Sequence, residues 1–373
     1  MDHYSICLLL GVLVTLLAVT SIVNILRKRT ALGIDAALIE TLRSRVRSWW
    51  LLFGMLVGAF LCGHITTVIL FALISFWALR EYITLTPTRP ADHLTLVLVF
   101  FLCTPFQFCL VAINPEWFLK VFNIAPYLVF SIFVPVYVFL LLPAGIAISG
   151  DSKQFLERVA KIQVGLLICV YSLSFAPALL TMNVSAPPSK EHQTVTEAIP
   201  PDLEKMAADA IQGGNGFSVT ADSLRKETAV PLQPFRGEAL RLLFFFVLIV
   251  QAGDVFQYLW SQPAVSRHVI APAINSSRTW EGVLGGAATT SVLSIALWWV
   301  TPFPYWWQTA FLGFTVSIMG FAGSLTMSAI KRDRGVKDYG SLIEGHNGIL
   351  DRIDSMCFAA PVFYHLVWFF LHT

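Results

Sequence analysis

Charge is scarce in this sequence of 373 residues: Asp, Glu, Lys and Arg together make up only 13%, whereas an ordinary soluble domain carries roughly 25%. Apolar residues make up 56%. This combination excludes a soluble globular protein and an intrinsically disordered one. Only six cysteines occur, and most of them lie inside apolar runs, so neither a disulfide scaffold nor a cysteine metal site is indicated. The small net charge of +2 gives no support for nucleic-acid binding.

The sequence contains many long apolar runs with few charged residues. A hydrocarbon core about 30 Å thick needs roughly 20 apolar residues per helix. The sequence therefore predicts an all-α polytopic membrane protein with about ten transmembrane segments. These lie at roughly 4–26, 49–62, 64–79, 93–113, 125–148, 162–182, 239–256, 283–302, 308–330 and 356–372. The first is expected to be a retained helix, because the three residues before it carry no Lys or Arg. Segments 49–62 and 64–79 are expected to form a short helical hairpin that breaks at Gly63-His64.

The basic residues predict which loops share a side of the membrane. With the hairpin counted as two spans, five segments fall on one face and hold 18 of the 25 Lys and Arg residues. These segments are 27–47, 80–92, 149–161, 257–282 and 331–355. Short loops rich in Lys and Arg face the cytoplasm, so this face is expected to be the inner one, with both termini outside.

One polar segment divides the chain. Residues 183–237 contain two Pro-Pro pairs and a Gly-Gly pair, and they are expected to form an external loop. The loop separates an N-terminal transmembrane region, 1–182, with six spans, from a C-terminal region, 238–373, with four. The C-terminal region is expected to be catalytic, for the reasons that follow.

Ten of the 48 charged residues lie within Ser328–Ser355, between two apolar spans on the inner face. Fixed cations, carboxylates and a glycine-rich backbone are what a phosphate together with a divalent metal requires. The segment therefore predicts a phosphate site at the membrane surface. Its polar members and glycines are Lys331, Arg332, Asp333, Arg334, Gly335, Lys337, Asp338, Gly340, Glu344, Gly345, His346, Gly348, Asp351, Arg352 and Asp354.

Several of these residues also have an ordinary structural interpretation. Asp351 and Asp354 are three positions apart, so they share one face at the start of a helix and can hold Mg²⁺ together. They can equally cap that helix and pair with Arg352. Lys331-Arg332 can anchor a span at the inner interface, and a histidine between glycines is common in an ordinary turn.

A second polar cluster precedes the span at 283–302. Asp254 lies inside an otherwise apolar run, where a charge costs at least about 2.5 kcal/mol near the bilayer centre, so it is a functional candidate. Arg278, Trp280 and Glu281 follow in the segment SSRTWEGVLGG. The alternatives are a carboxylate that reaches the interface and a tryptophan of the interfacial belt.

Taken together, the two clusters resemble the CDP-diacylglycerol synthase family, also called phosphatidate cytidylyltransferases. Its C-terminal motif has a Ser, Lys-Arg, Lys-Asp, Gly-His-Gly-Gly and Asp-Arg-x-Asp. The matching residues are Ser328, Lys331, Arg332, Lys337, Asp338, Gly345, His346, Gly348, Asp351, Arg352 and Asp354. The family's Lys-Lys-Thr-Trp-Glu-Gly element is matched by Arg278, Thr279, Trp280, Glu281 and Gly282, and Asp254 stands in the place of the preceding Asp. The resemblance covers about 250–360.

The chain departs from the family at several positions. Asn347 replaces a glycine of the His-Gly-Gly turn, and Ser277 replaces the first lysine of the Lys-Lys pair. Bacterial members usually carry Gly-Asp-Leu, followed by Glu two residues later, before the C-terminal motif. This chain has Gly323-Ser324-Leu325-Thr326-Met327 instead. The resemblance implies that this Asp is a metal ligand together with the residue matching Asp351, so Ser324 marks a divergent member.

The resemblance implies an enzyme that joins CTP to a phosphatidate-type lipid, with release of pyrophosphate, on the cytoplasmic face of a bacterial inner membrane. Mg²⁺ is expected as cofactor, with Asp351, Asp354, Asp254 and Asp338 as ligands. Lys331, Arg332, Lys337, His346, Asp351 and Arg352 are the expected catalytic residues. Arg278, Trp280, Glu281, Ser328, Gly345 and Gly348 are the expected substrate-binding residues. A homodimer is a family expectation.

Two alternatives remain open at the level of sequence. The first is a divergent or inactive paralogue that acts as partner of another lipid enzyme. The second is a transporter that uses Asp254 and Glu281 as intramembrane charges, although charge concentrated on one face argues against a transport pathway.

Overall fold

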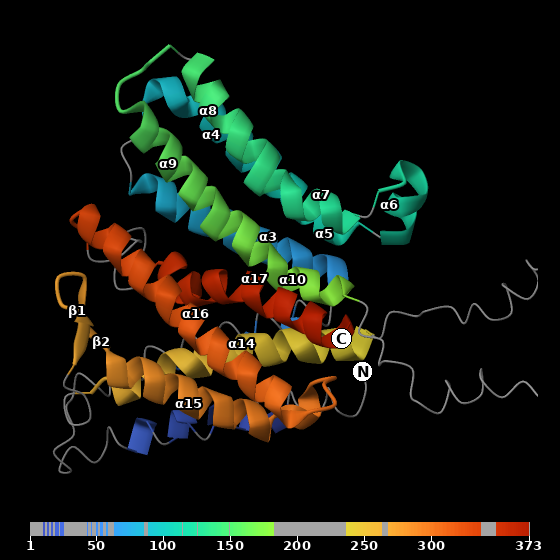
Figure 1. Ribbon diagram of the computed structural model, residues 1–373, viewed down its shortest axis with the longest axis vertical. Helices are drawn as coiled ribbons and strands as arrows, with labels where there is room; N and C mark the ends of the chain where they lie inside the picture. Colours follow the sequence, from blue (N-terminus) through green and yellow to red (C-terminus); the bar gives the residue numbers. More distant parts are fainter. Residues whose placement is uncertain are drawn as a thin grey trace, which may run out of the picture.

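The computed structural model describes residues 63–85, 89–113, 115–124, 126–148, 150–182, 236–262, 268–336 and 348–372, with scattered positions between 10 and 58. This part of the chain is almost entirely helical (Figure 1). The helices are α3 (His64–Thr84), α4 (His93–Leu98), α5 (Thr104–Ala112), α6 (Pro115–Phe122), α7 (Pro126–Ile132), α8 (Phe139–Ile148), α9 (Phe155–Leu166), α10 (Leu173–Ala178), α14 (Arg236–Trp260), α15 (Trp280–Ala296), α16 (Trp306–Asp333) and α17 (Leu350–His372).

Among the described residues, seven continuous helices are long and apolar enough to cross a membrane. They are His64–Thr84, His93–Ala112, Pro126–Ile148, Phe155–Thr181, Glu238–Trp260, Trp306–Asp333 and Leu350–His372. The chain is therefore an integral membrane protein of helical class, as the composition predicts.

The predicted count of about ten spans is not confirmed. The structure describes about half of the positions in segment 4–26 and fewer in segment 49–62. The loop 183–237 lies outside the described residues up to residue 235, so the domain division there stays a prediction. The predicted span 283–302 is a shorter helix, α15, of 17 residues, followed by a 3₁₀ turn at Trp298–Val300. The predicted break at Gly63 is present: this residue has φ 105° and directly precedes α3.

Three spans of the N-terminal region contain a π-helical stretch. Val99–Cys103 joins α4 to α5, Phe133–Val138 joins α7 to α8, and Leu167–Ser172 joins α9 to α10. Backbone groups in a bilayer must find partners within the protein. Neighbouring side chains supply them: the Ser75 hydroxyl donates to the Cys169 carbonyl at 2.7 Å, and the Gln163 amide donates to the Phe139 carbonyl at 2.8 Å.

The C-terminal helices α14, α15, α16 and α17 pack side by side, with glycines at their contacts (Figure 1). A Cβ atom on Gly286 of α15 would lie 2.9 Å from the Gln257 backbone of α14. A Cβ atom on Gly323 of α16 would lie 2.6 Å from the Asp354 carbonyl oxygen of α17. Small residues let membrane helices approach this closely.

A two-stranded antiparallel hairpin connects α14 to α15 at one end of the bundle (Figure 1). Its strands are β1 (Val269–Ala271) and β2 (Asn275–Thr279). Thr279 then caps α15, because its hydroxyl accepts the Gly282 backbone N–H at 3.1 Å. The sequence predicts only an inner loop over 257–282, so the two strands are a difference from the all-α prediction.

The described parts of four predicted inner segments meet at this same end. Arg334, after α16, lies 3.4 Å from Glu157 of α9. Glu81 of α3 accepts backbone N–H groups at the start of α17. Asn275 of the hairpin donates to Ser328 of α16 at 3.3 Å. The charge pattern therefore groups these segments correctly, and we call this end of the bundle the basic end.

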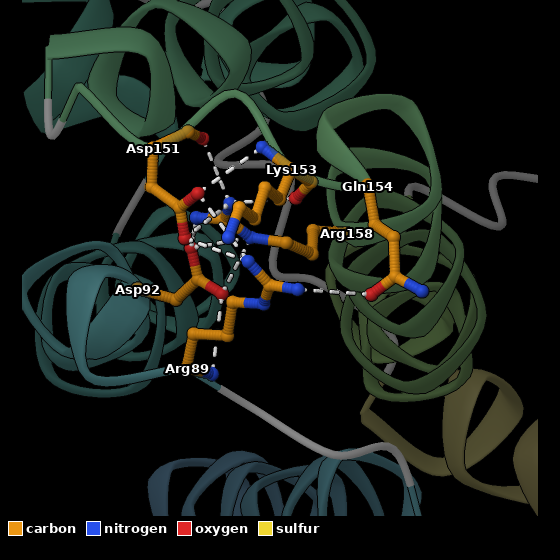
Figure 2. Close-up of polar contacts among 6 residues, drawn as sticks. All are labelled: Arg89, Asp92, Asp151, Lys153, Gln154 and Arg158. Atoms are coloured by element: carbon orange, nitrogen blue, oxygen red, sulfur yellow. Dashed lines mark hydrogen bonds and ion pairs between the residues drawn. The ribbon is translucent and has the colours of Figure 1, made fainter.

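A buried ion pair organises the N-terminal region at the basic end (Figure 2). The Arg158 guanidinium, 5% exposed, pairs with Asp92, which is 2% exposed, and it also donates to the carbonyls of Asp151 and Lys153 at 2.8 and 3.2 Å. Arg89 pairs with the Asp151 carboxylate at 3.0 Å, and this contact holds the pKa of the Asp151 carboxyl below its usual range.

Arg158→Ala is expected to lower the apparent melting temperature by more than about 5 °C, because it leaves the Asp92 charge buried without its partner. Arg89→Ala is the matched control: its partner Asp151 is more exposed, so the melting temperature should fall by at most about 2 °C. Tryptophan fluorescence of the detergent-purified protein during heating measures both. Equal melting temperatures for the two variants would contradict the importance of the buried pair.

Candidate functional site

Four elements of the C-terminal region meet at the basic end. They are the end of α14, strand β2, the end of α16 and the start of α17 (Figure 1). Because α14, α15 and α16 pack at glycines, the polar residues at their ends come within hydrogen-bond distance of one another. The predicted site residues in the described ranges are carried by these elements or by the first turn of α15, except Gly348, which directly precedes the start of α17.

Arg278 of β2 reaches between two transmembrane helices. Its Nη2 donates to the Ser324 hydroxyl of α16 at 2.6 Å, and its Nη1 donates to Oε1 of Gln257 of α14 at 3.2 Å. Gln257 is buried and is itself fixed, since its amide donates to the Ser317 carbonyl at 2.7 Å. Arg278 is thus a half-buried cation held in one orientation. A guanidinium has five N–H donors, so such an arginine is suited to binding a phosphate.

Two carboxylates from different helices flank one hydroxyl. Ser355 Oγ lies 2.8 Å from Asp254 Oδ1 of α14 and 3.3 Å from Asp354 Oδ1 of α17. A serine hydroxyl has one proton and cannot donate fully to both carboxylates. Gly320 of α16 faces this group, because a Cβ atom there would lie 3.3 Å from Ser355 and 3.9 Å from Asp254. The arrangement brings two carboxyl groups from different helices together around one hydroxyl.

Asp351 lies one turn before Asp354 and is paired with a lysine. The Lys331 ammonium of α16 donates to Asp351 Oδ1 at 2.7 Å, and both side chains are largely shielded from solvent. The first turns of α17 therefore carry both acidic residues that the sequence places on one helix face. Their partners differ. Asp351 pairs with the Lys331 ammonium, whereas Asp354 accepts from the Ser355 hydroxyl, which also contacts Asp254.

The other predicted residues occupy different positions. Arg332 is exposed and donates to the Ile274 carbonyl of the hairpin at 3.1 Å. Ser328 donates to the Ser324 carbonyl at 2.7 Å, and Arg352 is half-buried beside Asp351. Gly348 is buried just before α17. Lys337, Asp338, Gly345 and His346 lie outside the described residues.

Trp280 and Glu281 begin α15. Trp280 is 56% exposed, as expected of a tryptophan at a membrane interface. Glu281 pairs with the exposed His268, whose Nδ1 lies 2.5 Å from Glu281 Oε1. Glu281 thus contributes to fixing the base of the hairpin that carries Arg278.

The carboxylates at this end are candidate ligands for a divalent cation. No group of three or more His, Cys, Asp and Glu side chains within the described ranges is close enough to hold a metal ion. Mg²⁺ commonly uses one or two carboxylates and completes its shell with substrate phosphates and water. The two carboxylates beside Ser355 fit a cation of that kind.

Three residues of this end were missed at the sequence level. Gln257 has a detectable signal, since it lies one helical turn after Asp254 on the same face. Ser355 directly follows Asp354, but nothing in the sequence distinguishes it from other serines within a helix. The sequence predicts a span that ends at residue 79 and so places Glu81 in a loop, whereas α3 continues to Thr84.

Comparisons of sequence relate this chain to known proteins. A sequence model of the Cytidylyltransferase family matches residues 43–370. An uncharacterized protein of Escherichia coli, YnbB, is 31% identical over 327 residues, which cover 87% of this chain and 86% of that protein.

Shorter matches link the chain to named enzymes. The phosphatidate cytidylyltransferase of Synechocystis is 45% identical over 95 residues, 25% of this chain and 32% of that enzyme. The Haemophilus influenzae phosphatidate cytidylyltransferase is 37% identical over 144 residues, 37% of this chain and 49% of that enzyme. These two matches span less than half of each enzyme. On the family match and the long alignment together, the chain is a membrane protein of the cytidylyltransferase family.

Proposed function

We propose that this protein is a nucleotidyltransferase that condenses CTP with a phosphatidate-type lipid, giving CDP-diacylglycerol and pyrophosphate for phospholipid synthesis. The observation that carries the proposal is the meeting of Arg278, Lys331 and three carboxylates at the basic end of the bundle. Fixed cations bind phosphates, and carboxylates bind the cation that accompanies a nucleoside triphosphate. A lipid phosphate and a soluble nucleotide meet only at a membrane surface, which is where this end is expected to lie.

In the proposed reaction, an oxygen of the lipid phosphate attacks the α-phosphorus of CTP. The bond from that phosphorus to the oxygen bridging the α- and β-phosphates breaks, and pyrophosphate leaves with the electron pair. The lipid phosphate is already an anion near neutral pH, so no strong general base is needed. Catalysis then depends on positioning and on neutralising negative charge.

The described residues divide this work between them. Arg278 is held by Ser324 and Gln257 and is proposed to bind a phosphate through its guanidinium group. Lys331, oriented by Asp351, is proposed to neutralise charge on the phosphates that react. Asp254 and Asp354 are proposed to hold Mg²⁺, which supplies further neutralisation of the triphosphate when bound. Arg332, Lys337, Asp338 and His346 are proposed to complete the site.

The proposed location is the cytoplasmic face of a bacterial plasma membrane. It rests on the excess of Lys and Arg in the segments that meet at the basic end. Exposed Trp280 at this end suits the headgroup region, where tryptophan rings are favoured.

The proposal is tested by lipid mass spectrometry after overexpression. Membranes from cells that overproduce the protein should accumulate a lipid whose fragmentation releases cytidine monophosphate, relative to cells with empty vector. The mass of the remainder identifies the acceptor lipid. If no cytidine-containing lipid rises in these membranes, the proposed product is wrong.

A second candidate, a paralogue with weakened activity, is favoured by one observation. Ser324 stands where the resemblance implies a metal-binding Asp, and here its hydroxyl accepts from Arg278 at 2.6 Å. Such a paralogue would act as partner of another lipid enzyme. The two candidates differ in what an aspartate at this position should do.

We expect Ser324→Asp to leave kcat unchanged and to raise KM for CTP by about threefold. An aspartate at this position would pair with the adjacent Arg278 guanidinium and take it away from the nucleotide. Steady-state kinetics with purified protein, CTP and phosphatidate measure both constants. A tenfold or larger gain in kcat would instead show that the wild-type metal site is weakened, and would favour the second candidate.

A further inference from the structure

Glu81 is an acidic residue inside the membrane bundle that the proposed mechanism does not use. It lies in the last turn of α3, in the N-terminal region, and is only 6% exposed. Carboxylates are almost never this buried unless they are paired. Its partners therefore indicate why the chain keeps an acid at this position.

Both oxygens of Glu81 accept backbone N–H groups at the start of α17. Oε1 accepts from Ile349 at 3.1 Å and Oε2 accepts from Leu350 at 2.9 Å, across a sequence separation of 268 and 269 residues. The first N–H groups of a helix have no partner within it and need a cap. Gly348 and Ile349 have no polar side chain, so Glu81 supplies this cap from another helix. Its negative charge also suits the positive end of the helix dipole.

The capped turn carries the residues of the proposed site. Asp351 directly follows Leu350, and Asp354 and Ser355 lie one turn further along. The start of α17 is held from three helices: Glu81 of α3 at the backbone, Lys331 of α16 at Asp351, and Asp254 of α14 at Ser355. The Glu81 contact sets where the helix begins, and thereby which way its first side chains point.

We propose that Glu81 is a positioning residue for the cytidylyl transfer: by capping α17 across the bundle, it orients Asp351 and Asp354 for the phosphate and metal site. This inference rests on the proposed function. It assigns the N-terminal region a part in the site, although this region carries none of the residues that the sequence motifs single out.

Glu81→Gln tests the proposal with nearly unchanged side-chain volume. The amide oxygen can still accept one N–H group, but the amide NH₂ opposes the second one, and the charge is lost. Glu81→Asp keeps the charge on a shorter side chain and should give an intermediate result. Ser75→Ala is the matched control, because Ser75 is a buried residue of α3 whose hydroxyl donates to the Cys169 carbonyl rather than to the start of α17.

The first readout is hydrogen exchange by mass spectrometry on the purified protein without substrate or metal. In Glu81→Gln, backbone amides in the peptide 348–356 should exchange about tenfold faster than in wild type. Peptides from 306–333 should be unchanged, and Ser75→Ala should match wild type over 348–356. Unchanged exchange in 348–356 for Glu81→Gln would overturn the capping role. If that variant does not fold, Glu81→Asp takes its place in the same comparison.

The second readout is the Mg²⁺ dependence of CDP-lipid formation. The concentration for half-maximal rate should rise about tenfold in Glu81→Gln, while KM for phosphatidate stays within about twofold. Ser75→Ala should leave the Mg²⁺ dependence unchanged. An equal shift in both variants would show a general loss of packing and overturn the positioning role. If wild type forms no CDP-lipid, the proposed function fails, while hydrogen exchange still decides whether Glu81 caps α17.

Discussion

Asp351→Asn is expected to lower kcat/KM for CDP-lipid formation by about 100- to 1000-fold, the range seen when one charged or hydrogen-bonding group is removed from a preorganised site. The Asp351 carboxylate holds the Lys331 ammonium at 2.7 Å, and it lies one turn before Asp354, a proposed Mg²⁺ ligand. Asparagine keeps the shape of the side chain but removes the charge. The lysine then loses its orientation, and the site loses one of its carboxylates. Initial rates with purified protein at saturating Mg²⁺ measure the effect.

Asp333→Asn is the matched control for this change. Asp333 is the last residue of α16, its side chain is 69% exposed, and it pairs with the neighbouring Arg334. Removing its charge should change kcat/KM by less than about twofold, because exposed pairs contribute little. If Asp351→Asn folds normally and keeps activity within about fivefold of wild type, Asp351 is not part of the catalytic machinery.

Gly323→Ala is expected to reduce both stability and activity. The new Cβ atom would lie 2.6 Å from the Asp354 carbonyl oxygen and 3.0 Å from the Phe358 ring, so α16 and α17 must separate. Overpacking of this kind typically costs about 1–3 kcal/mol. The separation also moves Lys331 away from Asp351, and we therefore expect activity to fall by about tenfold or more. Thermal unfolding and initial rates measure the two effects.

Gly253→Ala is the control for a general intolerance of alanine in these helices. Gly253 lies within α14, and a Cβ atom there would lie 3.4 Å from the Ser317 hydroxyl, an ordinary contact distance. Alanine also has a helix propensity up to about 1 kcal/mol better than glycine. This variant should therefore be as stable as wild type or more so. Wild-type stability and activity in Gly323→Ala would show that the contact between α16 and α17 does not depend on the glycine.

The sequence predicts the arrangement of the bundle wherever local patterns determine it. Apolar runs give the helices, Gly63 gives a break, and the distribution of Lys and Arg gives the segments that meet at the basic end. Two helix boundaries differ from the prediction, because charged residues in the sequence favour loops. Arg158 is inside α9 and Glu81 is inside α3. Their charges are offset by Asp92 and by the backbone of α17, and a local reading of the sequence cannot identify partners so distant along the chain.

The candidate site shows the same limit. The spacing of Asp351 and Asp354 predicts correctly that both lie at the start of one helix. The spacing does not predict that Lys331 pairs with Asp351. Nor does it predict that Asp354 shares the Ser355 hydroxyl with Asp254. These pairings depend on the close packing of three helices at glycines, which the sequence indicates only as a general possibility.

The hairpin that carries Arg278 was also not predicted. Its strands have three and five residues, and the second strand, Asn-Ser-Ser-Arg-Thr, has no apolar alternation by which a strand is ordinarily recognised. Two contacts hold the hairpin in this conformation. Asn275 donates to Ser328 of α16, and Thr279 caps the start of α15. The sequence singled out Arg278 correctly as a site residue, but the helices that it joins became apparent only from the structure.

The most direct test of the central claim follows the phosphorus atoms of CTP. The purified protein, reconstituted in vesicles that contain phosphatidate, is incubated with Mg²⁺ and with CTP labelled at either the α- or the γ-phosphate. Cytidylyl transfer predicts that the α-label enters the lipid phase as CDP-diacylglycerol and that the γ-label appears only in pyrophosphate, in equal amounts. Release of γ-label as inorganic phosphate with no α-label in any lipid would contradict the account.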